Sequence, residues 1–117
     1  MNKQLPVSDK MIELVARRFR MLGDATRLRI LQVLETRENS VTGIARALGE
    51  SQPNVSKHLQ SLHAVGLLTR RRAGNSILYA IADPVVFKLC ALVCRSTTES
   101  TRSEFHELLA GPAPRGR

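Results

Sequence analysis

The segment VTGIARALGESQPNVSKHLQSL, from Val41 to Leu62, constrains the fold more than any other part of this chain. Ser40 stands where an N-cap would begin a first helix, and Gly49 stands where that helix would end. Ser51 then caps a second helix, whose first turn contains a proline at a place where a missing N–H costs little. Two helices separated by a three-residue turn predict a helix-turn-helix.

Two helices are predicted before this segment. Ser8 caps the first, which runs to about Leu22 and carries an apolar stripe on one side. Asp24 caps the second, ATRLRILQVLE, in which apolar residues cover most of the circumference. A helix of that kind is expected at the centre of the core, covered by its neighbours.

After the helix-turn-helix the period of the apolar residues changes. The segment LLTRRRAGNSILYAI, residues 67–81, alternates with period two around an Ala-Gly-Asn turn signal and predicts a two-stranded hairpin. Asp83 and Pro84 form an N-cap and N1 pair for a last helix from Val85 through at least Cys94, with a weaker helical pattern beyond it. The order α-α-α-α-β-β-α, with a hairpin wing directly after a helix-turn-helix, predicts a mainly α winged helix-turn-helix fold.

The length of 117 residues predicts one domain, placed at 8–110. We expect flexible ends at 1–7 and at 111–117, where GPAPRGR cannot pack. No apolar run approaches the ~20 residues that span a bilayer, and the N-terminus lacks the apolar region of a signal peptide. We therefore expect a cytoplasmic protein without a membrane partner.

The net charge of the chain indicates which class of binding partner to expect. Eighteen Lys and Arg against ten Asp and Glu give a net charge of +8 and an isoelectric point near 10.8. An isoelectric point above about 9 in a small domain is typical of nucleic-acid binding, although a generic basic surface has the same composition.

The second helix of the helix-turn-helix has two different sides. Val55, Leu59 and Leu62 form a buried stripe, whereas the opposite side is polar and has no acid. In a major groove a glutamine can pair with adenine, a serine with several bases, and a proline can contact a thymine methyl. Residues further along suit phosphate or guanine. His58 and His63 flank the stripe, and we expect both to be structural. The predicted DNA-contacting residues of this helix are Gln52, Pro53, Ser56, Lys57 and Gln60.

The predicted wing offers further cationic contacts. Alternation places Arg70 and Arg72 on one face and Arg71 on the other, with Asn75 at the tip. Such arginines suit phosphates or a narrow A·T-rich minor groove, and they also protect a short sheet edge from aggregation. We add Arg70, Arg72, Asn75 and Thr42, at the start of the preceding helix, to the predicted DNA contacts.

Two cysteines, Cys90 and Cys94, share one face of the last helix. Their Cβ atoms are expected about 6 Å apart, too far for a disulfide without unwinding. Packing at a dimer interface explains them, since free cysteine is often buried. Thiol sensing of a soft ion or metalloid is the functional alternative.

The segment FRMLGDATRLRILQVL and the signature S-Q-P-x-V-S-x-H-L resemble the ArsR/SmtB family of small bacterial winged-helix repressors. The resemblance covers roughly residues 10–97. It implies a homodimer on a palindromic operator, released by a metal ion, metalloid or redox signal, and it implies the same DNA-facing positions on the reading helix. It also implies dimerisation through the first and last helices, for which we predict the residues Leu14, Phe19, Val85, Leu89, Leu92 and Val93.

This sequence departs from the family at both of its usual metal sites. Ser40 and Thr42 stand where E-L-C-V-C-D-L sensors carry thiols. On the last helix Asp83 and Glu99 match the zinc and nickel pattern, but Val85 and Ser96 replace the imidazoles. We therefore predict no metal site of the usual kind and no required cofactor, with a thiophilic metal or metalloid at Cys90 and Cys94 as a candidate effector.

We favour a homodimeric operator-binding repressor over two alternatives. One is a winged-helix regulator without a small-molecule sensor, and the other is a winged-helix module that docks proteins. The acid-free face of the reading helix and the wing arginines favour DNA over a protein partner. The sequence offers no nucleophile–base pair, phosphate loop or paired acids, so we predict that it is not an enzyme.

Overall fold

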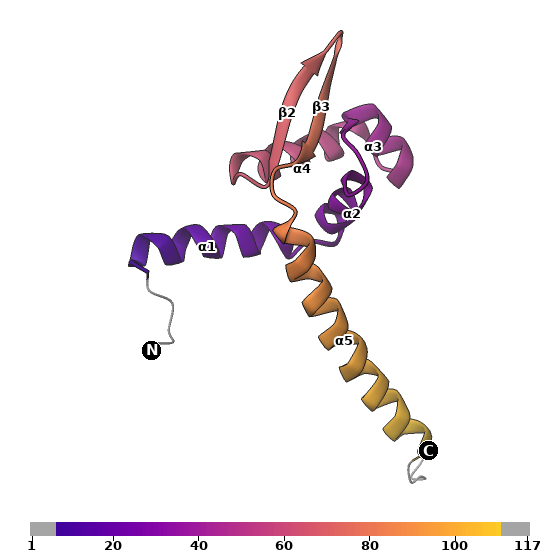
Figure 1. Cartoon of the computed structure of the whole chain (residues 1–117). Helices are drawn as coiled ribbons and strands as arrows, with labels where there is room; N and C mark the ends of the chain where they lie inside the picture. Colours follow the sequence, from indigo (N-terminus) through magenta and orange to yellow (C-terminus); the bar gives the residue numbers. More distant parts are fainter. Residues whose placement is uncertain (1–6, 111–117) are drawn as a thin grey trace. The chain divides into compact units, whose positions relative to one another are not determined.

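The computed structural model describes residues 7–110, which divide into two units, one ending at Asp83 and the other beginning at Pro84. The predicted flexible ends lie outside the described residues except for Val7. The order of elements confirms the predicted winged helix-turn-helix (Figure 1). The elements are α1 (Asp9–Leu22), α2 (Ala25–Leu34), β1 (Asn39–Ser40), α3 (Val41–Leu48), α4 (Gln52–Ala64), β2 (Leu68–Ala73), β3 (Ser76–Ile81) and α5 (Val85–Ala110).

The first four helices begin at the predicted polar caps. In each helix the side-chain oxygen of the cap accepts a hydrogen bond from the backbone N–H three residues further on, which satisfies one of the free donors of the first turn. The four caps are Ser8, Asp24, Ser40 and Ser51, with donor–acceptor distances of 3.2, 3.0, 3.0 and 3.3 Å respectively.

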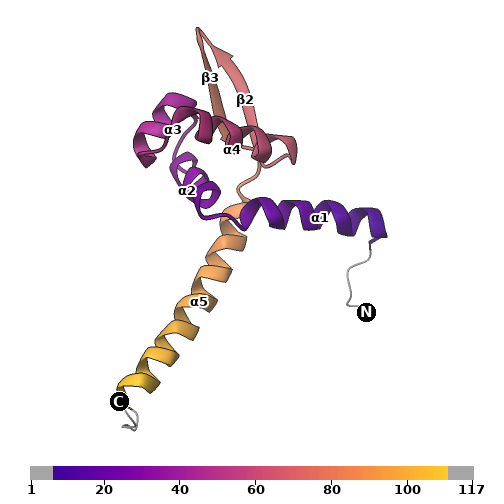
Figure 2. The same ribbon diagram turned by 180° about the vertical axis from the view of Figure 1, so that it is seen from behind.

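The core of the first unit lies around α2. This helix packs against α1, α3, α4 and β3, as its all-round apolar composition predicts (Figure 2). Complete burial of one such side chain stabilises a fold by about 1.5–3 kcal/mol. The buried side chains of the first unit are Ile30, Leu31, Leu34, Ile44, Ala45, Val55, Leu59, Leu62, Leu67, Leu68 and Tyr79.

The wing is part of a three-stranded antiparallel sheet with the order β1-β3-β2. Arg71 of β2 lies opposite Leu78 of β3, which in turn lies opposite Ser40 of β1. The tight turn between β2 and β3 has a positive φ of 64° at Gly74. The strand β1 was not predicted, because a two-residue strand is too short to show alternation in the sequence.

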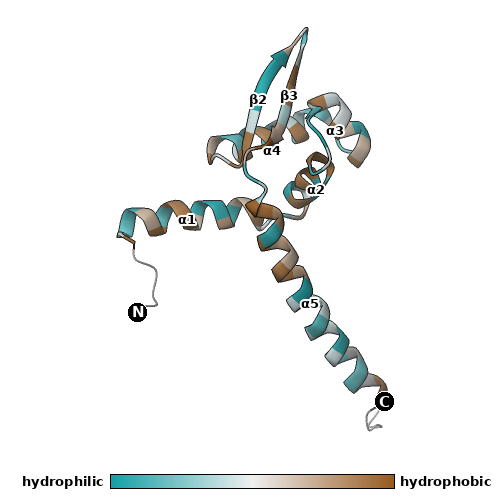
Figure 3. Ribbon diagram, viewed as in Figure 1, coloured by the Kyte–Doolittle hydropathy of each residue, from teal (hydrophilic) through white to brown (hydrophobic). Residues whose placement is uncertain are grey.

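The last helix extends beyond the segment in which apolar residues recur at helical spacing. The sequence predicts a helix through at least Cys94 and a separate weaker one, whereas α5 continues without a break to Ala110. Apolar colour is concentrated in its first half and hydrophilic colour in its second half (Figure 3). Neither glycine nor proline occurs within α5, so nothing in the backbone ends the helix where the apolar stripe fades. No helix in the described part of the chain is long and apolar enough to cross a membrane.

The turn between α3 and α4 depends on the backbone of Gly49, whose φ of 69° is left-handed. A Cβ built at this position would meet nothing within 4 Å, so any cost of substitution comes from the backbone conformation. We predict that Gly49→Ala lowers the free energy of unfolding by about 1 kcal/mol and that Gly49→Asn lowers it less, since asparagine tolerates this conformation better. Urea unfolding of the three proteins measures this order. A Gly49→Ala protein as stable as the parent would contradict it.

Candidate nucleic-acid interface

The helix α4 is fixed by one side and exposes the other. Val55, Leu59 and Leu62 have 0% exposed surface. The opposite side presents the predicted contacts to solvent, and α4 packs against both α3 and β2, so that helix and wing belong to one packed unit. Of the predicted residues, Gln52, Pro53, Lys57 and Gln60 are exposed and Ser56 is half-buried.

Two residues predicted to contact bases, Ser56 and Gln60, are hydrogen-bonded to each other. The Nε2 of Gln60 donates to the Oγ of Ser56 over 3.2 Å. With this bond in place, the hydroxyl proton of Ser56 is free to be donated outward, and the amide oxygen of Gln60 is free to accept. The pair therefore presents one donor and one acceptor side by side on the exposed face of α4.

An acid lies beside the start of α4, although α4 itself contains none. The Nδ2 of Asn54 donates to the Oε1 of Glu50 over 3.0 Å. Glu50 and its amide partner Asn54 each lie two positions from the predicted reader Gln52 in the sequence, yet the sequence reasoning included neither. The signal that could have found this pair is the i, i+4 spacing of the two residues.

The arginines of the wing do not act as one group. The guanidinium of Arg71 forms a bidentate ion pair with Glu38, with Nε–Oε1 and Nη2–Oε2 distances of 3.0 and 2.6 Å. The hydrogen bond and the positive charge of Arg71 lower the pKa of Glu38, and the carboxylate raises the pKa of Arg71. Arg70 and Arg72 are exposed, as is Asn75 at the turn. Among residues 7–110, Arg71 is thus the wing arginine that forms an ion pair, and contact of Arg70 and Arg72 with DNA stays a prediction.

Thr42, the remaining predicted contact, is exposed in the first turn of α3. Its helix begins at the cap Ser40, whose hydroxyl accepts from the N–H of Gly43. The Oδ1 of Asn39 accepts from the N–H of Ser40 over 2.8 Å. Ser40 and Asn39 are thus engaged with backbone N–H groups at this end of α3, whereas Thr42 is exposed.

His58 is half-buried, in agreement with the structural role expected for it, and its contact is specific. Its Nδ1 lies 3.3 Å from the Nη1 of Arg27 on α2. The Nε of the same guanidinium donates to the backbone oxygen of Met21 over 2.7 Å. The sequence reasoning placed His58 at the edge of the core but did not identify Arg27, which lies 31 positions away.

The N-cap of α2 lies close to this contact. The backbone N–H of Arg27 donates to Asp24, and this hydrogen bond is the main cause of a lowered pKa of the Asp24 carboxyl. The positive charge of Arg27 lowers it further.

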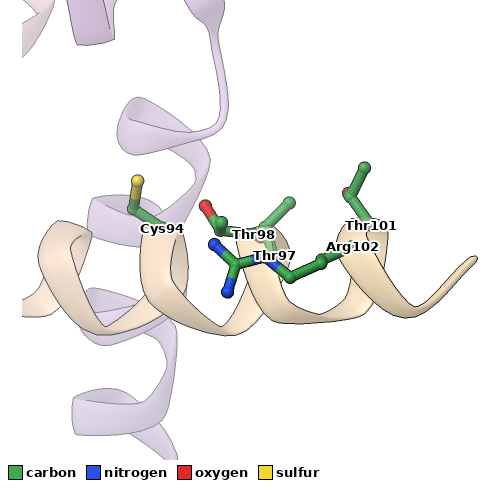
Figure 4. Close-up of a pocket in the computed structure, with 5 residues that line it drawn as sticks. All are labelled: Cys94, Thr97, Thr98, Thr101 and Arg102. Atoms are coloured by element: carbon green, nitrogen blue, oxygen red, sulfur yellow. The ribbon is translucent and has the colours of Figure 1, made fainter. Parts of the chain in front are cut away.

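The two cysteines of α5 are free thiols, Cys90 half-buried and Cys94 exposed. Within residues 7–110 no cluster of three or more His, Cys, Asp or Glu could hold a metal ion. A shallow open hollow lies on α5 itself, where a thiol, three hydroxyls and a guanidinium follow one helix face (Figure 4). Its lining residues are Cys94, Thr97, Thr98, Thr101 and Arg102.

The residues predicted to form a dimer interface leave much apolar surface exposed. On α1, Leu14 and Phe19 are 45% and 55% exposed. On α5, considered by itself, Leu92 and Val93 are 60% and 57% exposed. Val85 is also exposed and Leu89 is half-buried.

The ion pair of the wing gives a direct prediction. We expect Arg71→Gln to raise the pKa of Glu38 toward the ordinary glutamate value of about 4.3, because the variant loses both the charge and the bidentate hydrogen bond. Carboxyl carbon NMR over a pH titration measures this change, and Arg70→Gln is the matched control that leaves the pKa of Glu38 low. An unchanged pKa in Arg71→Gln would show that the ion pair does not form in solution.

The same pair sets the sign of a pH effect on stability. Because the pKa of Glu38 is lower in the folded chain than in the unfolded chain, the pair stabilises the fold above the unfolded-state pKa. This contribution is lost as the pH falls through the folded-state pKa of Glu38. The Arg71→Gln variant should therefore lose less stability than the parent over that acidic range.

Comparisons with known proteins agree with this geometry. The family model described as bacterial regulatory protein, arsR family, matches residues 24–70. The transcriptional regulator KmtR of Mycobacterium tuberculosis is 40% identical over 84 residues, which are 72% of this chain and 65% of that protein. A probable mercury resistance operon repressor of Streptomyces lividans is 40% identical over 77 residues, which are 66% of this chain and 62% of the repressor. The chain thus spans slightly less than two thirds of these two relatives.

A solved structure that matches this chain over nearly the whole length of the solved domain supports the same family assignment. It is a homodimeric winged helix-turn-helix DNA-binding domain from Mycobacterium bovis, described as a possible ArsR-family transcriptional regulator. It is 34% identical, with a TM-score of 0.73, and the match covers 86% of this chain and 95% of that domain. Sequence, fold and wing lead to one conclusion: this chain belongs to the arsR family of bacterial regulatory proteins.

Proposed function

We propose that this chain is a transcriptional repressor that binds a palindromic DNA operator as a homodimer. The observation that carries the proposal is the exposed, acid-free face of α4, held outward by three completely buried residues on the opposite side of the same helix. A helix presented in this way fits the major groove, whose width admits one α-helix.

The side chains of that face fit base edges. Gln52 in the first turn of α4 can pair with the N6 and N7 positions of adenine, and Pro53 can contact a thymine methyl. The joined pair of Ser56 and Gln60 offers a donor and an acceptor. Lys57, exposed on the same face, suits a phosphate or a guanine.

The wing and the start of α3 supply contacts to the backbone of the duplex. Arg70, Arg72 and Asn75 are exposed along the hairpin, and Thr42 is exposed in the first turn of α3. Arginines on a narrow hairpin suit phosphates or a narrow minor groove, where the negative potential is strongest. Arg71 is excluded from this set because Glu38 already binds its guanidinium.

Two observations support a dimer. Leu14 and Phe19 on α1, and Leu92 and Val93 on α5, leave apolar side chains largely exposed in the single chain. Burial of each such side chain against a second copy would contribute about 1.5–3 kcal/mol before the cost of association. The similar Mycobacterium bovis domain is described as homodimeric.

For the effector we propose a thiophilic metal ion or metalloid at Cys90 and Cys94. Both thiols are free, and the second is exposed beside hydroxyl groups on α5 (Figure 4). A similar protein is described as a probable mercury resistance operon repressor. Soft thiolate ligands favour soft ions, so mercuric ion and arsenite are the ligands to test.

Salt dependence separates the two kinds of DNA contact. With a duplex selected from a random library by the parent, log affinity should fall linearly with log salt, and Lys57→Ala should reduce that slope by about 1. Gln52→Ala should keep the slope and lose about 1–3 kcal/mol of preference for the selected sequence. Fluorescence anisotropy measures both, with Lys10→Ala as the control that changes neither. A parent slope near zero would contradict the DNA-binding proposal.

The thiol proposal has its own test. Mercuric ion or arsenite should release the parent from the selected duplex, whereas Cys90→Ser and Cys94→Ser together should stay bound, since serine does not hold soft ions. Without effector, parent and double variant should bind the duplex equally. Equal release of both proteins by these ligands would overturn the thiol sensor and would leave the cysteines with packing alone.

A further inference from the structure

One guanidinium joins three helices of the first unit. Arg27 of α2 donates from Nε to the oxygen of Met21 and from Nη2 to the oxygen of Arg20, over 2.7 and 3.3 Å. Both oxygens belong to the last turn of α1, where carbonyls lack the usual partner four residues on, although the oxygen of Arg20 also accepts from the N–H of Gly23 over 3.2 Å. The third nitrogen, Nη1, lies 3.3 Å from Nδ1 of His58 on α4. Arg27 therefore links the end of α1 directly to the reading helix.

A second arginine, Arg18 of α1, reaches the turn that follows α4. The Nη2 of Arg18 lies 2.9 Å from the position that a Cβ on Gly66 would take. Gly66 is in the turn that follows α4, where its N–H donates to the oxygen of His63. The end of α1 is thus linked to the middle of the reading helix through Arg27 of α2, and Arg18 of α1 lies close to the turn after the end of that helix.

The chemistry of the Arg27–His58 contact fixes the state of the imidazole. A guanidinium has only donors, so Nδ1 of His58 must be the acceptor, which requires a neutral ring with its proton on Nε2. Protonation of His58 would remove the acceptor and place two cations 3.3 Å apart. In the described part of the chain, the charged groups with an interaction with this ring are Arg27 and Asp24, both on α2. The Asp24 carboxylate is already occupied as the N-cap of α2, where it accepts from the backbone of Arg27.

We propose that Arg27 and His58 are positioning residues for operator recognition, which hold α4 in its reading position only while His58 is neutral. His58 lies on the turn of α4 that also carries Ser56 and Lys57, so a shift of the ring would move two predicted contacts. This inference rests on the proposed DNA-binding function. Neither residue needs to touch DNA, because the effect passes through the placement of α4.

The sign of the pH effect distinguishes this role from simple electrostatics. An additional positive charge on a DNA-binding domain ordinarily strengthens binding to any duplex, because the phosphate backbone attracts it. Loss of the Arg27–His58 contact instead weakens binding to the selected sequence alone. The useful quantity is therefore the specificity ratio, the affinity for the selected duplex divided by that for a scrambled duplex of equal length and composition.

The experiment measures this ratio between about pH 5.5 and about pH 8, the range in which histidines usually titrate. We expect the parent ratio to fall on acidification. His58→Leu removes the acceptor, and Arg27→Lys keeps the charge but cannot bridge three acceptors. Both should lower the ratio at the alkaline end about tenfold, while binding to the scrambled duplex stays within about twofold.

A conservative variant provides the rescue. His58→Asn places an amide oxygen near the position of Nδ1 and does not titrate, so it should keep a high ratio with no pH dependence. His63→Asn is the matched control on the same helix, and it should reproduce both the ratio and the pH profile of the parent. The inference is overturned if His58→Leu and Arg27→Lys keep the parent ratio, or if His58→Asn keeps the parent pH profile.

Nitrogen NMR of His58 separates this inference from the proposed function. The neutral ring should carry its proton on Nε2, and Arg27→Lys should change the Nδ1 shift of His58 while that of His63 stays constant. A parent that selects no sequence would contradict the proposed function and the positioning role together, with the tautomer still deciding whether the contact exists. A parent that selects a sequence while His58 is protonated on Nδ1 would overturn the positioning role alone.

Discussion

The complete burial of one side of α4 is the constraint on which the rest of this molecule depends. Val55, Leu59 and Leu62 are removed from water entirely, and a helix that buries one stripe must turn the opposite stripe outward. The polar face of α4 is therefore fixed in direction by apolar packing on the central helix α2. The helix α3 and the strand β2 pack against α4 as well, so the wing is placed by the same core.

Charge is distributed so that cations remain available where DNA is proposed to bind. Arg71 is neutralised by Glu38, and Arg27 is used inside the fold, whereas Arg70, Arg72 and Lys57 stay exposed. The arginines that contribute to the net charge of +8 therefore differ in what they bind. Arg27 and Arg71 are bonded to other groups of the fold, and the exposed cations are those proposed to contact phosphates.

The proposed release of DNA depends on a different part of the chain. Ser40 and Thr42 leave no thiols at the start of α3, and Ser40 instead caps that helix. The free thiols lie on α5, which carries its apolar residues in its first half and its polar residues in its second half (Figure 3). In the sequence, the proposed sensor is therefore separate from the residues proposed to read the operator. The end of α1, by contrast, is linked to α4 through Arg27 of α2.

The sequence by itself determined the first four helices, their caps and the exposed face of α4, because these depend on contacts three or four residues apart. Asp24 and Ser51, for example, accept from N–H groups three positions on. Only the tertiary structure decided the partners of Arg27, of Arg71 and of β1. The Arg27–His58 and Arg71–Glu38 contacts join residues 31 and 33 positions apart, and such pairs leave no periodic signal, since the folding of the whole core brings them together.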